Sequence, residues 1–192
     1  MPNIFHLFVG GTTGKWKVEH ISTLAGSTIP QVPHLAILDG YQTPLQQDYV
    51  WLLRGVTSYE RYVQKAEQMA LVAQQPSLGR PNATCAALIP IKKSSTWWEL
   101  AQDERRLIFE ERSQHITTGL KYLPAVARRL YHCHDLGEPF DFLTWFEYAS
   151  SDEEAFDELV GILRQTEEWT FVEREIDIRL VLEDTLSFTQ EA

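Results

Sequence analysis

The sequence predicts an α+β protein in which a strand–helix–strand unit occurs twice. In the first unit, an apolar strand over 49–53 precedes a helix over 58–75, and a second apolar strand covers 84–91. In the second, residues 139–149 alternate between polar and apolar, a helix follows as far as Leu163, and residues 169–182 alternate again. A period of two is typical of half-buried strands, whereas the segments between them repeat apolar residues at helical spacing.

The two units also resemble each other in sequence. Placing Trp51 over Trp145 brings Tyr62 over Phe156. Because units of this kind build ferredoxin-like folds, we predict two such halves, whose antiparallel sheets form a barrel-like core with helices outside. The halves cover about residues 1–92 and 137–192, and we expect the whole chain, 1–192, to form a single compact domain.

Local signals define the predicted elements of the two halves. Short strands over 3–9, 16–21 and 34–38 precede the first unit, separated by glycine and proline. Ser58 is a suitable N-cap for the first helix, and Ser151 with Glu154 forms a capping-box pattern before the second. The apolar stripe of the first helix is predicted to contain Tyr62, Ala66, Met69 and Val72 or Ala73.

Between the halves, residues from about 93 to 136 are predicted to form a helical insert. Thr96 and Glu99 make a capping-box pattern, and apolar residues follow at helical spacing. Gly119 is expected to interrupt the run, and Pro124 suits the first turn of a further helix. Such an insert can cover one face of a sheet and enclose a pocket.

Composition and charge narrow the possible partners. The formal net charge of −10 argues against a nucleic-acid or anionic-membrane partner, and an anionic substrate would need local cations. No apolar run approaches the roughly 20 residues that span a bilayer, and the first ten residues lack a signal-peptide pattern. Two cysteines are too few for a disulfide framework, so we expect a cytoplasmic protein.

Residue pattern alone leaves several candidate sites open. His115 lies at the predicted end of a helix, where its imidazole could reach an iron centre or simply interact with the helix dipole. His132 and His134 flank Cys133, but no second pair stands at zinc-finger spacing, so an exposed helix end is expected there. On a helix, Arg128 and Arg129 would point about 100° apart, so one could face a cavity or both could be solvated.

One stretch carries a more specific combination of residues. It contains Lys93, Trp97 and Trp98, the run 104–106, His115, the run 119–122, Arg128 and the aromatic strand 142–147. This combination resembles the chlorite dismutase family, including the spacing from His115 to Arg128. The resemblance extends more loosely from about residue 45 to the end. The chain looks close to the short, cyanobacterial-type members, and this resemblance implies a homodimer with one haem b per subunit.

The resemblance implies roles for residues on both sides of a haem. His115 matches the axial ligand of the iron, and Glu168, with Glu167 as the alternative, matches the carboxylate that accepts a hydrogen bond from the other ring nitrogen. Lys93 and Trp97 match contacts on the proximal and propionate sides.

On the distal side, Arg128 matches a flexible arginine. Gln75, or Gln74 as the alternative, matches a glutamine that can hydrogen-bond it. Leu123 and Phe146 are expected to line the haem pocket.

The activity implied is the conversion of chlorite to chloride and molecular oxygen. In the family, a ferryl intermediate and a hypochlorite-level fragment recombine to form the O–O bond. Arg128 would hold that anionic fragment in place. Because neither arginine nor glutamine accepts protons well at neutral pH, we expect weak peroxidase activity.

Two alternatives remain at this stage. The related coproheme decarboxylases typically carry glutamine in place of Arg128 and a Tyr-Pro pair where this chain has Ile89 and Pro90. A haem carrier or sensor, or a scaffold without cofactor, belongs to a different functional class. Solvent exposure of His115 would favour the scaffold.

Overall fold

The computed structural model describes residues 5–40, 49–57 and 61–183. Its strands close into an antiparallel barrel in the order β1–β3–β2–β8–β5–β7–β6–β4. The strands are β1 (Phe5–Gly11), β2 (Trp16–Ala25), β3 (His34–Asp39), β4 (Trp51–Val56), β5 (Cys85–Lys93), β6 (Ala127–His132), β7 (Phe142–Tyr148) and β8 (Val172–Leu182). The predicted α+β class, with a barrel-like core of antiparallel strands, is confirmed.

Large apolar side chains fill the barrel. Trp145 on β7 is 1% exposed and packs edge-on against Trp16 of β2, with ring centroids 5.3 Å apart. Leu88 of β5 and Ile178 of β8 are fully buried in the same cluster. Each such side chain contributes about 1.5–3 kcal/mol by leaving water. This core joins strands from both predicted halves.

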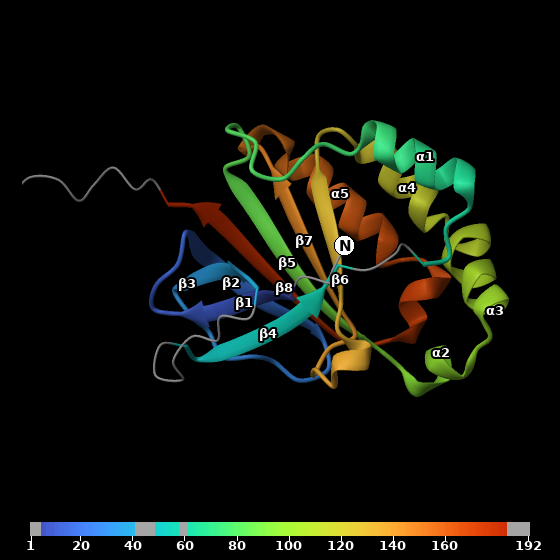
Figure 1. The fold of residues 1–192 in the computed structure, drawn as a ribbon, viewed down its shortest axis with the longest axis horizontal. Coiled ribbons are helices and arrows are strands. Elements are labelled where there is room, and N and C mark those ends of the chain that lie inside the picture. The colour runs from blue at the N-terminus through green and yellow to red at the C-terminus, as the bar shows by residue number, and fades with distance from the viewer. Residues whose placement is uncertain (1–4, 41–48, 58–60, 184–192) are drawn as a thin grey trace, which may run out of the picture.

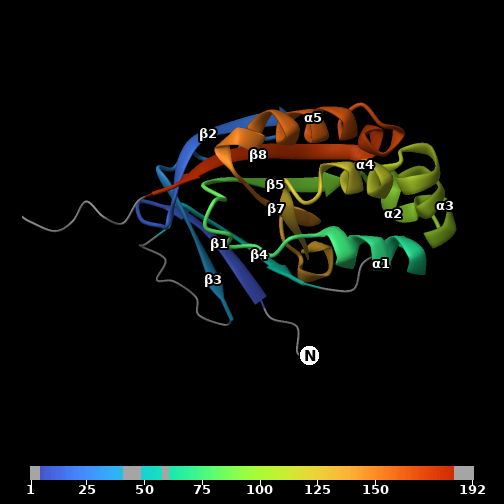
Figure 2. The same ribbon diagram turned by 90° about the horizontal axis from the view of Figure 1, so that it is seen from above.

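In Figure 1 the helices lie on one side of β5–β8, and β1–β4 lie on the other side. Seen from above, α4 lies between α1 and α5 (Figure 2). The helices are α1 (Lys65–Gln74), α2 (Ser95–Glu99), α3 (Gln102–Arg106), α4 (His115–Tyr122) and α5 (Glu153–Leu163). A π-helix, η2 (Leu107–Arg112), continues α3, and the 3₁₀ turns are η3 (His134–Leu136), η4 (Ser150–Asp152) and η5 (Glu167–Phe171). No helix among residues 5–40, 49–57 and 61–183 is long and apolar enough to cross a membrane.

The prediction of a helix after Pro124 is wrong. Residues Ala127–His132 form β6, which pairs with β7 from Ala127 opposite Glu147 to His132 opposite Phe142. Ladder hydrogen bonds to β7 outweigh the favourable helix propensity of alanine, arginine and leucine in this run. As a consequence, Arg128 and Arg129 point to opposite faces of a strand rather than about 100° apart on a helix.

Other local expectations for the insert are also corrected. His115 begins α4 instead of ending a helix, because Gln114 before it adopts a left-handed conformation with φ 51°. Gly119 lies inside α4. Cys133 is 1% exposed and follows a strand, so the segment around it is not an exposed helix end.

The first helix also differs from its prediction. It begins at Lys65 with Gln64 as N-cap, and Ser58, the expected cap, lies outside the described residues. Its buried residue is Leu71, whereas Met69 and Val72 of the predicted apolar stripe are exposed. Packing against α4 selects a different face of the helix from the one that periodicity favours.

Candidate active site

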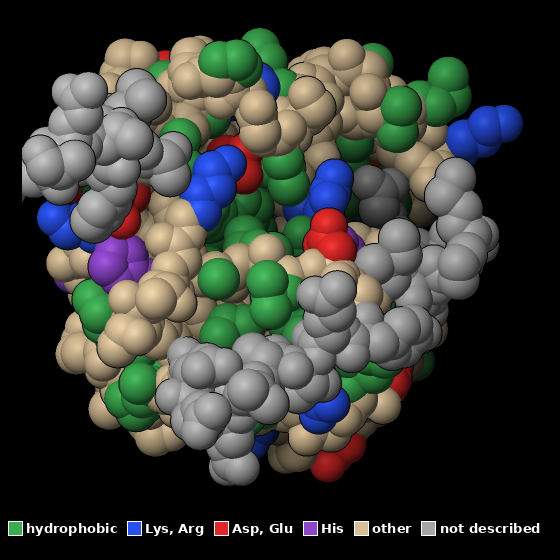
Figure 3. Space-filling view, turned by 60° about the vertical axis from the view of Figure 1, so that its left-hand side comes forward, with side chains coloured by type: hydrophobic (Ala, Val, Ile, Leu, Met, Phe, Trp, Pro, Cys, Tyr) green, Lys and Arg blue, Asp and Glu red, His purple; other side chains and the backbone are tan. Residues whose placement is uncertain are grey.

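A cavity of about 300 Å³ lies outside the barrel wall, beneath the helices. Its floor is the outward face of three neighbouring strands, because Ile89 of β5 and Leu130 of β6 both stand opposite Thr144 of β7. One register step along each strand adds Ile91, Phe142, Phe146, Arg128 and His132 to the same face. Figure 3 shows the molecule with the side of β1–β4 turned forward, where Lys and Arg side chains lie beside exposed hydrophobic ones.

His115 lines this cavity from the first residue of α4. Its Nδ1 lies 2.6 Å from Oε2 of Glu168, and its ring stacks on Phe109 with centroids 4.3 Å apart. Engagement of Nδ1 by a carboxylate selects the tautomer in which Nε2 carries the lone pair. Only Nε2 is then available to bind a metal.

Glu168 connects the histidine to a buried lysine. Its Oε1 accepts a hydrogen bond from Nζ of Lys93 at 2.8 Å, and both side chains are at most 5% exposed. Burial alone would raise the pKa of Glu168, but the charges and hydrogen bonds of His115 and Lys93 outweigh burial and lower it to about 2. The carboxylate is therefore ionised throughout the neutral range.

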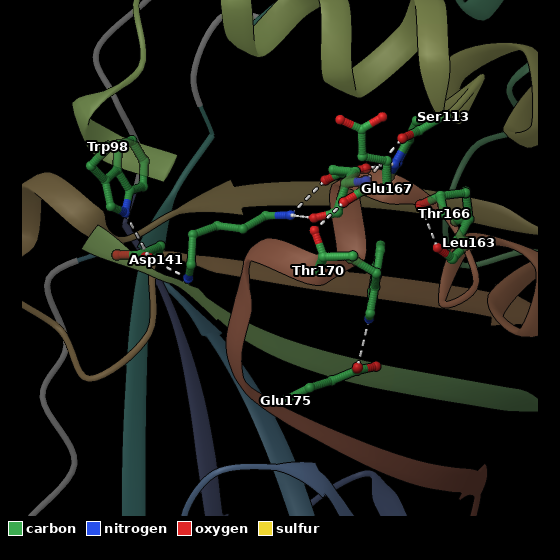
Figure 4. A network of polar contacts seen from close by, with 12 residues as sticks. Trp98, Ser113, Asp141, Leu163, Thr166, Glu167, Thr170 and Glu175 are labelled. Carbon is green, nitrogen blue, oxygen red and sulfur yellow. Dashed lines mark hydrogen bonds and ion pairs between the residues drawn. The ribbon is translucent and has the colours of Figure 1, made fainter. Parts of the chain in front are cut away.

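The surroundings of Glu168 distinguish it from its neighbour. The backbone N–H of Glu168 donates to Oγ of Ser113, whereas Glu167 pairs with Arg112 at the surface. Figure 4 shows this network, with Asp141 and Trp98 at one end and Ser113 and Glu167 at the other. Of the two alternatives left open by the sequence, the structure places Glu168 against His115.

Sequence reasoning missed Glu110, which anchors the first turn of α4. Its buried carboxylate accepts hydrogen bonds from the backbone N–H of Ile116 at 2.5 Å and from the N–H and Oγ1 of Thr117 at 3.1 and 2.5 Å. These are donors that a helix N-terminus leaves without intrahelical partners. The cap comes from the preceding π-helix, at a distance in sequence that the usual capping patterns do not cover.

Arg128 lies on the wall formed by β6. Nε2 of Gln75 donates to the backbone oxygen of Arg128 at 2.8 Å, so this contact fixes the strand rather than the guanidinium. Gln75 also lines the cavity, whereas Gln74 is an exposed residue that does not. Leu123 and Phe146, the residues predicted to line a haem pocket, are buried and line this cavity.

Trp97 supplies a buried polar atom that lacks a partner within the described chain. The residue is 1% exposed, its Nε1 has no hydrogen-bond acceptor there, and Nζ of Lys93 lies 4.8 Å from the ring centroid. Such an orphaned donor indicates an acceptor that the protein itself does not provide.

Open space lies beside His115, where a haem would need it. A Cβ atom added to Gly119, four residues after His115, would meet nothing within 4 Å, so the helix leaves open volume on that side. Leu159, Val160 and Leu163 of α5 give the cavity an apolar wall. An axial imidazole, an apolar wall and an unpaired donor suit an amphipathic porphyrin that carries carboxylates.

Comparison with known sequences identifies the family. Residues 41–181 match the sequence model of the family described as chlorite dismutase. The chain belongs to the chlorite dismutase family. A dimeric chlorite dismutase from Nitrobacter winogradskyi is 54% identical to it, with a TM-score of 0.86 over 93% of this chain and 99% of that one.

More distant relatives agree with this placement. The chlorite dismutase of Ideonella dechloratans is 33% identical over 131 residues, 65% of this chain and 42% of that protein, so the match spans less than half of that relative's length. The chlorite dismutase of Candidatus Nitrospira defluvii, in complex with imidazole, is 21% identical with a TM-score of 0.68, covering 95% and 93% of the two chains. This last likeness concerns the fold alone.

Proposed function

We propose that this protein binds haem b in the cavity and converts chlorite to chloride and molecular oxygen. The observation that carries the proposal is the buried chain of contacts from His115 through Glu168 to Lys93, on a cavity whose strand wall bears Arg128. The reaction balances as one chlorite giving one chloride and one dioxygen, with no net proton. Family membership and the 54% identical relative support it.

Residues around the cavity would hold the haem by complementary chemistry. Nε2 of His115 would be the axial ligand, and Nε1 of Trp97 would donate a hydrogen bond to a propionate. The missing side chain of Gly119 would leave room beside the ring. The apolar wall of α5 would face the substituents that carry no charge.

The proximal residues would set the electronic character of the ligand. When bound, haem supplies a redox-active iron with an open coordination position. Glu168, held ionised beside Lys93, would accept the Nδ1 proton of His115 in a hydrogen bond and make its imidazole more basic. A more basic ligand favours the higher oxidation states that this chemistry requires.

Arg128 would act on the substrate through charge. Its guanidinium stays protonated at all working pH values and can hold an oxyanion by charge-assisted hydrogen bonds. Gln75 would keep β6 in position through the backbone of Arg128. Neither group needs to accept a proton, in agreement with the balance of the reaction.

The alternative activities are less well supported. Ile89 lines the cavity at the position where decarboxylases have their tyrosine, and an aliphatic side chain cannot carry a radical as a phenol does. Solvent exposure of His115 would favour a scaffold without cofactor, but this side chain is only 16% exposed.

Assembly and location are part of the same proposal. The dimeric relative supports a homodimer with one haem b per subunit. Both cysteines, Cys85 and Cys133, are unpaired, which suits the reducing cytoplasm.

Oxygen evolution on adding chlorite to haem-reconstituted protein tests the function. We expect rapid release by the unmodified protein, loss of it in His115→Ala, and a weaker or quickly bleached reaction in Arg128→Ala. An ordinary ferric haem spectrum without any oxygen release would contradict the proposal and favour a carrier or sensor.

A further inference from the structure

A second hollow, of about 310 Å³, adjoins the cavity on its β6 side. It is lined by Leu71, Val72, Gln75, Pro76, Ser77, Leu78, Arg128 and Arg129. Four of these residues, Leu71, Gln75, Arg128 and Arg129, line the main cavity as well. The two spaces therefore share a wall in which the proposed substrate-binding arginine stands.

The charge of this hollow is opposite to that of the protein. Two arginines and no carboxylate are among its lining residues, although the chain as a whole carries −10. Arg129 is exposed, and the pairing of β6 places it opposite Trp145, whereas Arg128 stands opposite Phe146 on the other face of the strand. A small anion repelled by the overall field would meet a locally positive surface here.

Hydrogen bonds hold the loop that forms the outer wall. Gln75 is bound to the backbone of Arg128, and the N–H of Gly79 donates to Oε2 of Glu147 at 2.5 Å. The guanidinium of Arg80 donates to the backbone oxygens of Pro124 and Ala125, both at 2.9 Å. The shape of the hollow is thus fixed by contacts with β6, β7 and the segment before β6.

We infer that this hollow is the entrance for small anions, and that Arg129 attracts them toward the cavity without taking part in the chemistry. The inference rests on the proposed function for the identity of the anion, chlorite. It adds a residue that raises the rate of association, distinct from Arg128, which would hold the bound anion. An electrostatic role of this kind weakens with ionic strength.

The test compares two ligands of different charge on the ferric, haem-loaded protein. At about pH 8 azide is an anion, whereas imidazole is largely neutral. Association rates followed by stopped-flow absorbance are expected to fall about threefold for azide in Arg129→Gln and about tenfold in Arg129→Glu at low salt. Imidazole rates should not change, Arg129→Lys should restore the azide rate, and high salt should remove the differences.

Two further variants control for net charge and for the route. Lys17→Gln removes one exposed positive charge from β2, which lines neither space, and should leave both rates unchanged. Ser77→Trp narrows the hollow and should slow azide and imidazole together. Unchanged rates in both Ser77→Trp and Arg129→Glu, or equal slowing in Lys17→Gln and Arg129→Gln, would overturn the inference.

The same variants separate this inference from the proposed function. Charge-dependent azide association without any oxygen release from chlorite would support the entrance and contradict the function. Oxygen release with kcat/KM unaffected by Arg129→Glu would support the function and contradict the entrance.

Discussion

The two sides of the cavity are built differently. On the side of His115, both Glu168 and Lys93 are almost completely buried. The side-chain hydrogen bonds of Glu168 to His115 and to Lys93 are 2.6 and 2.8 Å long. On the side of Arg128, the partly buried arginine stands beside the exposed Gln75, which holds it through the backbone. The comparison teaches that buried contacts of the fold fix His115, the proposed axial ligand. The side of Arg128 acts through charge, and substitutions there should cost less of the free energy of unfolding.

Removing the charge of Glu168 should have the largest effect. Glu168→Gln leaves the ammonium of Lys93 buried without its ion-pair partner, which costs about 3 kcal/mol of the free energy of unfolding. The reduction potential of the bound haem should rise, because the imidazole loses basicity. Urea unfolding of the haem-free protein and a potentiometric titration of the haem-loaded protein measure the two effects.

Glu167→Gln is the matched control, since Glu167 pairs with Arg112 where both are exposed. Its unfolding free energy should change by less than about 0.5 kcal/mol and its potential should not move. Equal effects in the two variants would remove the distinction between the two sides.

On β6, burial of His132 should make the free energy of unfolding depend on pH. Burial, followed by the charge of Arg61, lowers the pKa of His132 to about 4, against the opposing charge of Asp135. Between pH 6.5 and about 4, the unfolded chain therefore binds a proton that the folded chain does not. The contribution of neutral His132 to the free energy of unfolding should be fully present above pH 6.5. The free energy of unfolding should then fall by about 2 kcal/mol as the pH approaches 4.

Denaturant unfolding of the haem-free protein across this pH range checks the prediction. His132→Gln should flatten the dependence of the unfolding free energy on pH. A parallel pH profile in the variant would assign the effect to other groups.

Glu110→Gln should weaken the support of the ligand by a smaller amount. One amide oxygen cannot replace both carboxylate oxygens, so at least one of the three donors on Ile116 and Thr117 loses its partner, at about 1–2 kcal/mol. If Glu110 positions His115, the iron–imidazole stretching band of the reduced haem protein should also shift. Glu104→Gln, which affects a cap at α3, should leave that band in place.

The smallest effect is expected on the distal side. Gln75→Ala removes one hydrogen bond from an exposed amide and should cost less than about 1 kcal/mol of unfolding free energy. Oxygen yield per haem before bleaching should fall more clearly than stability, because the strand that carries Arg128 loses an anchor. A loss of stability as large as that of Glu168→Gln would break the comparison.

The sequence was informative where local pattern and final environment agree. The apolar run of β5 reflects packing on both sides of the barrel wall, with Leu88 inside and Ile89 outside. The alternation of β8 reflects Ile176 and Ile178 inside the barrel, whereas Asp177 between them pairs with Arg164. The sequence did not decide whether Glu167 or Glu168 contacts His115, because adjacent residues share one local pattern. In the structure, η5 turns the side chain of Glu168 inward and leaves that of Glu167 at the surface.

Where tertiary pairing decides, the sequence misled. β6 contains alanine, leucine and two arginines, residues that suit a helix, and only its ladder with β7 makes it a strand. The role of Glu110 was missed for a related reason. Its partners lie beyond a left-handed residue, Gln114, and no local pattern predicts that turn.

The most direct test of the central claim follows the oxygen atoms of chlorite. Haem-loaded protein would receive unlabelled chlorite in water enriched in oxygen-18, with dioxygen analysed by mass spectrometry and chloride measured in parallel. The account predicts one dioxygen per chloride, with both oxygen atoms unlabelled. Dioxygen that carries the label of water, or chloride formed without dioxygen, would contradict it.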